Sequence, residues 1–268
     1  MNKLFLIPIL LLSLISFSSW GADFQKGLNA AKSGDYATAL REWKPLAEQG
    51  DADAQFNLGV MYDFGDGVPQ DDRTAVKWFT LAAEQGIANA QYNLGIMYRE
   101  GKGVPQDDRT AVKWFTLAAE QGVANAQLNM GFMYKKGHGV PKDYKTAMKW
   151  FTLAAEQGVA KAQYNIGVMY DKGHGVPKDY KTAVKWYTLA VEQGHAKAQY
   201  NLGLMYAKGK GVPQNNVYAY MWGNLAASNG DEGGGKLRDL AAEIMTPSQI
   251  EKAQELSREC VAKNYKGC

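Results

Sequence analysis

The hexapeptide Asn57-Leu58-Gly59-Val60-Met61-Tyr62 recurs in four later, closely similar copies at steps of 36 residues, beginning at Asn93, Asn129, Asn165 and Asn201. The same step relates the proline, tryptophan and glycine that follow each copy, first at Pro69, Trp78 and Gly86. A fixed period of this length is typical of solenoids, in which each unit buries its apolar face against its neighbours. The sequence therefore predicts a repeat architecture.

The first half of each unit has the pattern of an amphipathic helix. In the first copy Ala54, Leu58 and Met61 follow one another at steps of three and four residues, which puts them on one helix face. Gly65 suits a left-handed C-cap and Pro69 blocks continuation, so we expect the helix to end at this loop.

A second helix is expected to begin at Asp71 or Asp72, because acidic residues favour a helix N-terminus. Its apolar stripe comprises Ala75, Trp78, Phe79, Ala82 and Ala83. Gly59 lies in the middle of the first helix, where glycine costs about 1 kcal/mol relative to alanine. Since all five units repeat this cost, we expect another helix to cross close to Gly59 and its equivalents.

No segment has the pattern of a strand, so the predicted fold class is all-α. The ends differ from the repeats: the first unit has a shortened loop, and Thr246-Pro247-Ser248-Gln249 has the form of a capping box that opens a final helix. The predicted parts are a signal peptide (1–22), a short helix pair (23–50), five repeats (51–86, 87–122, 123–158, 159–194 and 195–230) and C-terminal capping helices (231–268).

The N-terminus has the form of a secretory signal peptide. Lys3 precedes an apolar run over residues 4–17, and small residues follow, so cleavage is expected after Gly21. The alternative, an uncleaved anchor, is disfavoured because the run is shorter than the roughly 20 residues of a membrane span. We therefore expect a periplasmic or secreted protein without membrane association after cleavage. A formal net charge of +3 gives no reason to expect nucleic acid binding.

The only two cysteines, Cys260 and Cys268, lie near the C-terminus. An even pair in an exported protein suggests a disulfide. In one continuous helix their Cα atoms would lie about 12 Å apart, too far for the bond, but Gly267 would let the tail fold back. The alternative is a buried Cys260 with a loose Cys268.

Three consecutive stretches resemble the Sel1-like repeat, a relative of the tetratricopeptide repeat with a longer loop: Tyr92-Asn93-Leu94-Gly95-x-x-Tyr98, Gly101-x-Gly103-Val104-Pro105 and Ala118-Ala119-Glu120-Gln121-Gly122. The resemblance covers residues 24–230, and the short first unit is closer to a plain tetratricopeptide. It implies a right-handed α/α superhelical solenoid whose first helices line a concave face that holds protein partners or peptides. Cysteine-rich relatives have been linked to β-lactam binding or hydrolysis, but this chain lacks their repeated cysteine pairs.

Catalytic signatures are absent from the sequence, and residues that occur five times are expected to be scaffold. His138 and His174 occupy the same loop position in successive units, yet no acid or cysteine recurs in register to complete a metal shell. His195 begins a first helix and is expected to be a partly covered surface residue. The sequence therefore predicts no metal site, no cofactor and no enzymatic activity.

One asparagine per repeat needs a cause, since asparagine is a mediocre helix former. The resemblance places this residue on the concave face, where its amide can bond a peptide backbone. The alternative is a structural hydrogen bond to the neighbouring unit, and the two roles are compatible. The asparagines are Asn57, Asn93, Asn129, Asn165 and Asn201.

Charge changes along the repeats, from net −5 in 51–86 through zero in 87–122 to between +2 and +3 in the last three units. Such a gradient favours oriented binding. By the geometry of the family, the concave positions are also those at which the units disagree. They add these candidate partner-binding residues: Asp53, Asp63, Arg99, Lys135, Lys136, Lys172 and Lys208.

Together these features predict a monomeric, non-catalytic scaffold or adaptor of the bacterial envelope that binds a protein or an extended peptide in its concave groove. Two alternatives stay open. One is a binder or hydrolase directed at cell-wall or β-lactam compounds, and the other is an architectural assembly factor that acts through the solenoid ends.

Overall fold

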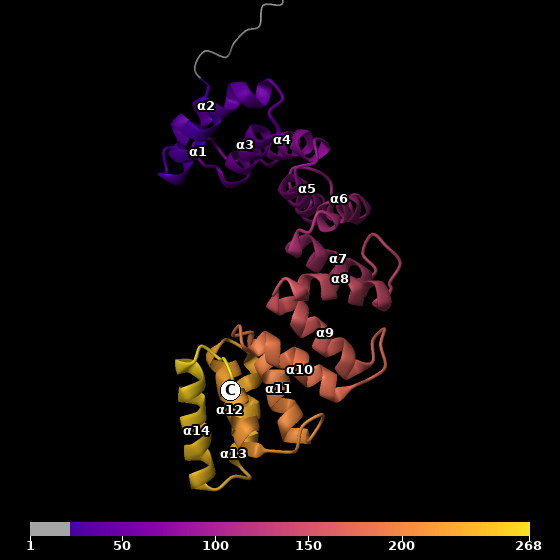
Figure 1. Cartoon of the computed structure of the whole chain (residues 1–268), viewed down its shortest axis with the longest axis vertical. Helices are drawn as coiled ribbons and strands as arrows, with labels where there is room; N and C mark the ends of the chain where they lie inside the picture. The colour runs from indigo at the N-terminus through magenta and orange to yellow at the C-terminus, as the bar shows by residue number, and fades with distance from the viewer. Residues whose placement is uncertain (1–21) are drawn as a thin grey trace, which may run out of the picture. The chain divides into compact units, whose positions relative to one another are not determined.

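The computed structural model describes residues 22–268, so the predicted signal peptide lies outside the described residues except for Ala22. In this part of the chain every regular element is an α-helix; there are fourteen helices and no strand (Figure 1). This confirms the all-α prediction. None of the helices between residues 22 and 268 has the length and apolar character that a membrane crossing needs.

The chain forms two compact units, which meet in sequence between Leu81 and Ala82. The first contains α1 (Phe24–Lys32), α2 (Tyr36–Glu48), α3 (Ala52–Phe64) and most of α4 (Asp72–Glu84). The second contains α5 (Ala88–Glu100), α6 (Asp108–Glu120), α7 (Ala124–Lys136), α8 (Tyr144–Glu156), α9 (Ala160–Lys172), α10 (Tyr180–Val191), α11 (Ala196–Lys208), α12 (Asn216–Ser228), α13 (Glu232–Ala242) and α14 (Pro247–Ala262). In the second unit consecutive helices pack as pairs, α5 with α6 through α11 with α12.

Helix boundaries follow the predicted capping chemistry. Gly101 ends α5 in the left-handed conformation, with φ 71°, and its N–H donates to the carbonyl oxygen of Met97. Asp107 caps α6: its Oδ1 accepts from the backbone N–H of Arg109 at 2.9 Å, and its Oδ2 accepts from the Thr110 hydroxyl at 2.6 Å. The Thr110 hydrogen bonds lower the pKa of the Asp107 carboxyl, which favours its charged, accepting form.

In α3, α5, α7 and α9 the glycine in the middle of the helix faces an aromatic ring of its partner helix, whereas Gly203 of α11 faces the side chain of Leu237 in α13. A Cβ on Gly95 would lie 2.6 Å from Cδ1 of Phe115 in α6, and one on Gly59 would lie 2.5 Å from Cδ1 of Phe79. Real Cβ atoms do not approach a ring so closely. The expected close crossing is therefore present, and an aromatic side chain rather than backbone fills the space over the glycine.

A row of glutamines, which we call the glutamine ladder, joins successive repeats of the second unit. Gln91 of α5 donates its amide to the carbonyl oxygen of Ala83 at 3.1 Å. The same Gln91 accepts at Oε1 from Gln121, which also donates to the carbonyl oxygen of Gly86. The ladder continues with Gln127 and Gln157, then Gln163 and Gln193, and ends with Gln199 and Asn229.

Because the first-helix glutamines are buried, these hydrogen bonds satisfy polar groups of Gln91, Gln127 and Gln163 that water cannot reach. Gln199 differs, since its Nε2 is buried without a hydrogen-bond partner. The hydrogen bonds of the ladder also fix the register of one repeat on the preceding one. The first unit contains the equivalent contact, from Gln55 to the carbonyl oxygen of Ala47 at 3.0 Å.

Helices α13 and α14 follow the last repeat. The run Gly233-Gly234-Gly235 lies inside α13, where a Cβ on Gly234 would lie 2.7 Å from the carbonyl oxygen of Gly223 in α12. The run therefore permits contact between two helix backbones. Thr246 and Gln249 form the predicted capping box at the start of α14, which packs beside α12.

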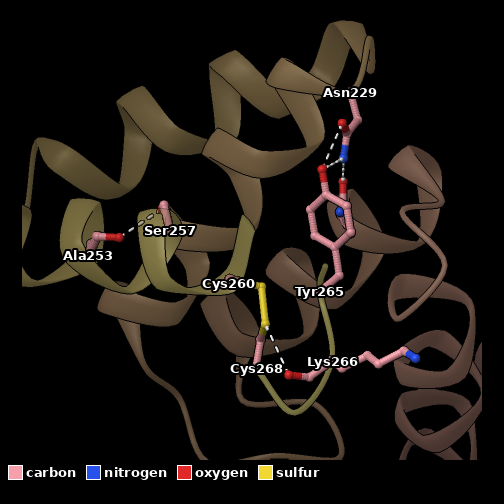
Figure 2. Close-up of a disulfide and its surroundings, with 8 residues drawn as sticks. Asn229, Ala253, Ser257, Cys260, Tyr265, Lys266 and Cys268 are labelled. Carbon is pink, nitrogen blue, oxygen red and sulfur yellow. Dashed lines mark hydrogen bonds between the residues drawn. A yellow bond between two sulfur atoms is a disulfide. The ribbon is translucent and has the colours of Figure 1, made fainter. Parts of the chain in front are cut away.

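The C-terminal tail folds back after α14. Cys260 and Cys268 are joined by a disulfide, with their Cα atoms 5.5 Å apart. The turn between them holds Tyr265 against Asn229, and the tyrosine hydroxyl and the asparagine amide are 3.1 Å apart (Figure 2). The closed tail thus lies at the last step of the glutamine ladder.

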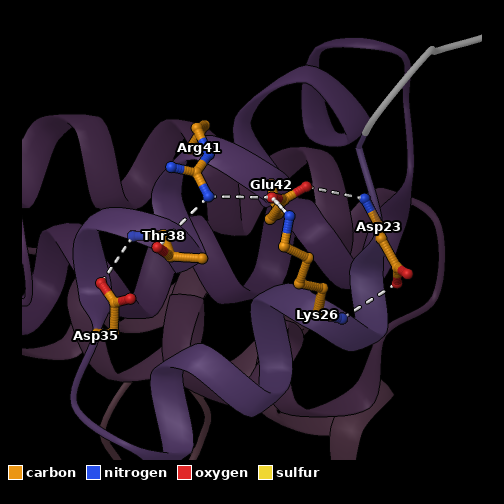
Figure 3. Close-up of polar contacts among 6 residues, drawn as sticks. All are labelled: Asp23, Lys26, Asp35, Thr38, Arg41 and Glu42. Carbon is orange, nitrogen blue, oxygen red and sulfur yellow. Dashed lines mark hydrogen bonds and ion pairs between the residues drawn. The ribbon is translucent and has the colours of Figure 1, made fainter.

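A buried carboxylate organises the first helix pair (Figure 3). The side chain of Glu42 in α2 is only 4% exposed and lies 2.7 Å from Nζ of Lys26. It also accepts from the backbone N–H of Asp23 at 3.2 Å and from Arg41 at 3.4 Å. The hydrogen bond from Lys26 lowers the pKa of Glu42, so the carboxylate stays charged and ties the start of α1 to α2.

Candidate functional site

Four of the five repeated asparagines, Asn57, Asn129, Asn165 and Asn201, have side-chain hydrogen-bond partners within the chain. In the second unit Asn129 accepts from Arg99 at 3.0 Å, and Asn165 accepts from Lys135 at 2.8 Å. Each bond joins residues 30 positions apart, so a variable cation of one repeat contacts the asparagine of the next. Asn201 instead donates to the hydroxyl of Tyr187 at 3.2 Å. These contacts fit the structural role considered for the asparagines.

Asn57, in the first unit, donates to the carbonyl oxygen of Asp53 in its own helix at 2.9 Å. Asp63, in the same helix, accepts at its carbonyl oxygen from Gln70 at 3.0 Å. Neither of the hollows described below includes Asn93, Asn57, Asp53 or Asp63.

Two hollows lie on the surface formed by the first helices of the second unit, which we call the first-helix face. The first, named the Phe132 hollow, has a volume of about 370 Å³. It is lined by Arg99, Asn129, Phe132, Met133, Lys136, His138 and Lys161. Helices α5, α7 and α9 all contribute. No carboxylate lines it, and Nζ of Lys161 lies 5.3 Å from the centre of the Phe132 ring.

The second, named the Tyr187 hollow, has a volume of about 280 Å³. It is lined by Tyr164, Val168, Asp171, Lys172, Tyr187, Asn201, Leu204, Met205, Lys208 and Lys210. Six of these residues stand two repeats after six residues of the Phe132 hollow: 171 after 99, 201 after 129, 204 after 132, 205 after 133, 208 after 136 and 210 after 138. The same hollow thus recurs with different side chains.

The two hollows differ in chemistry at the positions that vary. Arg99 in the Phe132 hollow corresponds to Asp171 in the Tyr187 hollow, where the carboxylate pairs with Lys172 at 3.0 Å. Tyr187 replaces the phenylalanine of the earlier repeats, and its hydroxyl accepts from Asn201. Burial, reinforced by the charge of Asp171, raises the pKa of Tyr187, so its hydroxyl stays neutral.

Lys135 has a different environment from its neighbour Lys136. It is half-buried beneath Asn165, whereas Lys136 is exposed at the rim of the Phe132 hollow. Burial, followed by the nearby charge of Lys136, lowers the pKa of Lys135. The candidate lysines therefore divide into Lys135, which bonds the next repeat, and the exposed Lys136, Lys172 and Lys208.

The structure gathers Arg99, Asn129 and Lys136 in one hollow, and it gathers Lys172, Asn201 and Lys208 in the other. Sequence reasoning missed the aromatic floors, since Phe132, Tyr164 and Tyr187 look like core residues. Lys161 and Lys210 were also left out of the candidate residues. Their signal was available, because both stand at positions where the repeats differ.

The loop histidines lie in different surroundings. His138 lines the Phe132 hollow, whereas the ring of His174 stacks on Tyr144 with centres 4.5 Å apart. His195 stacks on Tyr164 and caps α11, since its Nδ1 accepts from the N–H of Ala198 at 3.2 Å. Between residues 22 and 268 no cluster of three histidine, cysteine or acidic side chains is suited to hold a metal.

Paired helices in a regular 36-residue repeat, joined by a buried polar ladder, define an α/α solenoid repeat protein. The sequence model of the Sel1 repeat family matches residues 52–87, 88–123, 124–159, 160–195 and 196–231. The chain belongs to the Sel1 repeat family, whose members are generally non-catalytic scaffolds for protein–protein interaction. The matched boundaries fall one residue later than those read from the period.

Two crystal structures support this assignment. A Sel1 repeat protein from Oxalobacter formigenes is 34% identical with a TM-score of 0.79, over 88% of this chain and 99% of that one. The protein c5321, a protective antigen present in uropathogenic Escherichia coli strains with an SLR fold, is 33% identical with a TM-score of 0.74. That match covers 91% of this chain but 57% of c5321. No curated protein matches the chain.

Proposed function

We propose that this protein is a non-catalytic binding module of the bacterial envelope that holds an extended, acidic segment of a protein partner on its first-helix face. The observation that carries the proposal is the recurrence of one hollow, two repeats apart, with altered chemistry at its variable positions. A scaffold that only supported itself would have no need to diversify an exposed hollow while its core stays constant.

The Phe132 hollow suits an aspartate or glutamate side chain. Lys136 and Lys161 supply positive charge, Arg99 and Asn129 supply hydrogen-bond groups, and Phe132 packs against the apolar stem. Arg99 is partly neutralised by Glu100 at 2.6 Å, which leaves the two lysines as the principal charges. Charge-assisted hydrogen bonds to a carboxylate are stronger than neutral ones.

The Tyr187 hollow suits a neutral polar side chain with an acidic neighbour. The hydroxyl of Tyr187 and the amide of Asn201 form a polar floor, while Lys208 and Lys210 stand at the rim. The partner would then be read along the groove, with its acidic part over the later repeats. This orientation follows the charge gradient, and steering of this kind acts mainly on the association rate.

The decisive experiment compares two triple variants, each of which has one substitution in each of three consecutive repeats. The test variant is Lys136→Glu, Lys172→Glu and Lys208→Glu. The matched control is Lys113→Glu, Lys149→Glu and Lys185→Glu, which reverses three exposed lysines on second helices. Peptide ligands would be selected from a displayed library by their binding to the mature chain. The association and dissociation rates of the selected peptides would then be measured at low and high salt.

We expect the selected peptides to be rich in aspartate and glutamate. The first triple variant should slow their association and weaken its salt dependence, and the control should change both far less. Exposed pairs contribute only about 0–1 kcal/mol each, so single substitutions should be quiet. Peptides without acidic enrichment, or equal effects of the two triples, would contradict the proposal.

Export is the second part of the proposal and rests on the predicted signal peptide. The similarity to c5321, a protective antigen, supports it. Cell fractionation with intact mass measurement tests it: the mature protein should appear outside the cytoplasm, and its mass should be that of a chain that begins at Ala22. A cytoplasmic, full-length chain would contradict it.

A further inference from the structure

A third hollow lies away from the first-helix face, where the last Sel1 repeat meets the C-terminal helices, among α12, α13 and α14. Its volume is about 550 Å³, within the range of roughly 300–1,000 Å³ that is usual for small-molecule sites. We call it the cap hollow. Its lining residues are Tyr220, Asn224, Leu225 and Ser228 of α12, Arg238 of α13, and Gln254, Ser257, Arg258 and Val261 of α14.

Two guanidinium groups line this hollow and no carboxylate does. Asp239 lies beside Arg238 but takes only its Nε, at 2.8 Å, so both terminal nitrogens of Arg238 are left without a carboxylate partner. Arg258 takes part in none of the ion pairs found in residues 22–268. The hollow is therefore a concave site with two guanidinium groups: Arg258 is in no ion pair, and Arg238 is partly neutralised by Asp239 while its two terminal nitrogens stay available.

Neutral polar groups in the hollow are arranged so that donors remain available. Tyr220 accepts at its hydroxyl oxygen from Gln254 at 3.3 Å, which leaves the phenolic proton free to donate. Ser228 donates its hydroxyl to the backbone oxygen of Asn224. Among residues 22–268, the side-chain amide of Asn224 takes part in no hydrogen bond. Leu225 and Val261 supply apolar wall.

We propose that the cap hollow binds a small organic anion, in which a carboxylate or a phosphate is attached to an apolar body. The planar guanidinium group matches the two oxygens of such an anion and donates paired hydrogen bonds to them. The apolar part would lie on Leu225, Val261 and the Tyr220 ring. This inference is independent of the partner proposed for the first-helix face.

The test is a titration of the full mature chain, labelled with ¹⁵N, by four probes. N-acetylleucine carries a carboxylate, N-acetylleucinamide is its neutral counterpart, phenyl phosphate carries a phosphate on an apolar ring, and inorganic phosphate is the anion alone. We expect N-acetylleucine or phenyl phosphate to shift the amide resonances of Asn224, Arg238 and Ser257, and the neutral amide to shift none. Whichever anion binds more tightly identifies the source of the charge.

Two double variants separate a built site from general attraction of anions. Arg238→Gln with Arg258→Gln should weaken binding about tenfold or more, as expected for loss of charge-assisted hydrogen bonds. Lys236→Gln with Lys252→Gln removes the same charge from exposed positions of α13 and α14, outside the hollow, and should leave binding within about twofold. If the arginine double variant unfolds, Arg258→Gln alone serves, because Arg258 is exposed.

Three results would overturn the proposal. The first is the absence of binding by every anionic probe at millimolar concentration. The second is equal binding of N-acetylleucine and its neutral amide, and the third is an equal loss of affinity in the arginine and lysine double variants.

Discussion

Tyr265 and Asn229 exchange two hydrogen bonds of 3.1 Å across 36 residues, the length of one repeat. In earlier repeats a glutamine stands at the position of Asn229. Its amide donates to the carbonyl oxygen of the glycine that ends the previous repeat, as Gln121 does to Gly86. Asparagine is one methylene shorter, and Tyr265 packs over Gly194 in the remaining space. The tail thus completes the last step of the glutamine ladder.

The disulfide should stabilise this tail. Closing a loop of this size contributes about 2–3 kcal/mol in the chain-entropy model. Cys268→Ser removes the bond without placing a hydroxyl in the core, because Cys268 is exposed whereas Cys260 is 2% exposed. We expect a lower melting temperature for Cys268→Ser and for the reduced wild type, and no change for Lys266→Ala. Two free thiols, found by intact mass after alkylation of exported protein, would contradict the bond.

A Cβ on Gly95 should destabilise the fold. Gly95→Ala forces the Phe115 ring to move, and overpacking typically costs about 1–3 kcal/mol. Gly235→Ala is the matched control, since Gly235 lies in a helix with nothing within 4 Å of a new Cβ, and it should gain up to about 1 kcal/mol. Denaturant unfolding measures the difference, and two variants of equal stability would refute the crossing argument.

The buried half of a ladder step should matter more than the exposed half. Gln127→Met keeps the volume but removes two hydrogen bonds, from Gln127 to the carbonyl oxygen of Ala119 and from Gln157 to Gln127. Ala119 still accepts from the N–H of Gly122, and Gln157 still donates to the carbonyl oxygen of Gly122, so the expected cost is that of the lost bonds, about 0.5–1.5 kcal/mol each. Gln157→Met should cost less, because Gln157 is exposed and water can replace part of its contacts. Thermal unfolding of both variants provides the comparison, and a larger loss for Gln157→Met would be the contrary result.

His195 should make stability fall in mild acid. Its Nδ1 accepts a hydrogen bond only when unprotonated, and burial, with Lys197 and Lys161 nearby, lowers its pKa from the usual value of about 6.5. The folded state therefore resists protonation that the unfolded state accepts. Stability is complete above pH 6.5 and declines as the pH falls from there toward the lowered pKa.

The variant His195→Asn keeps a capping side chain without a titrating ring. Melting temperatures between pH 7.5 and pH 5.5 should fall less in this variant than in the wild type. Parallel profiles for the two proteins would exclude His195 as the cause.

Glu42 should also stabilise the folded state at neutral pH. It does so as a charged carboxylate, whereas His195 does so as a neutral ring. The hydrogen bond from Lys26 lowers the pKa of Glu42 below the usual value of about 4.5, so this contribution is present above that pH and is lost as the pH falls through the lowered value. Glu42→Gln should lower the melting temperature at neutral pH and flatten its acid dependence. Glu48→Gln, an exposed change in the same helix, should do neither. Identical acid profiles for Glu42→Gln and the wild type would count against the buried ion pair.

Much of the fold could be predicted because its causes are local and repeated. The end of a first helix depends on one glycine, as at Gly101, and the start of a second helix depends on one acid, as at Asp107. The glutamine ladder was missed although its signal was present. Gln91 and its equivalents recur in register beside the apolar stripe, where a polar residue needs a buried partner.

The candidate site was only partly predictable. The variable positions pointed to Arg99 and Lys136, since those are side chains that differ among repeats. The hollow itself depends on which residues meet across three helices, and that is set by packing rather than by period. The pairing of Arg99 with Asn129 and of Lys135 with Asn165 shows why, because each bond joins different repeats.

The glutamine ladder has a consequence for how such a gene can change. Each step between Gln91 and Gln163 uses the same donors and acceptors as the step before it. A duplicated or deleted unit of 36 codons would therefore meet a matching surface on both sides without any new mutation at the joins. Recombination between the near-identical copies can then lengthen or shorten the protein while its two ends remain as they are.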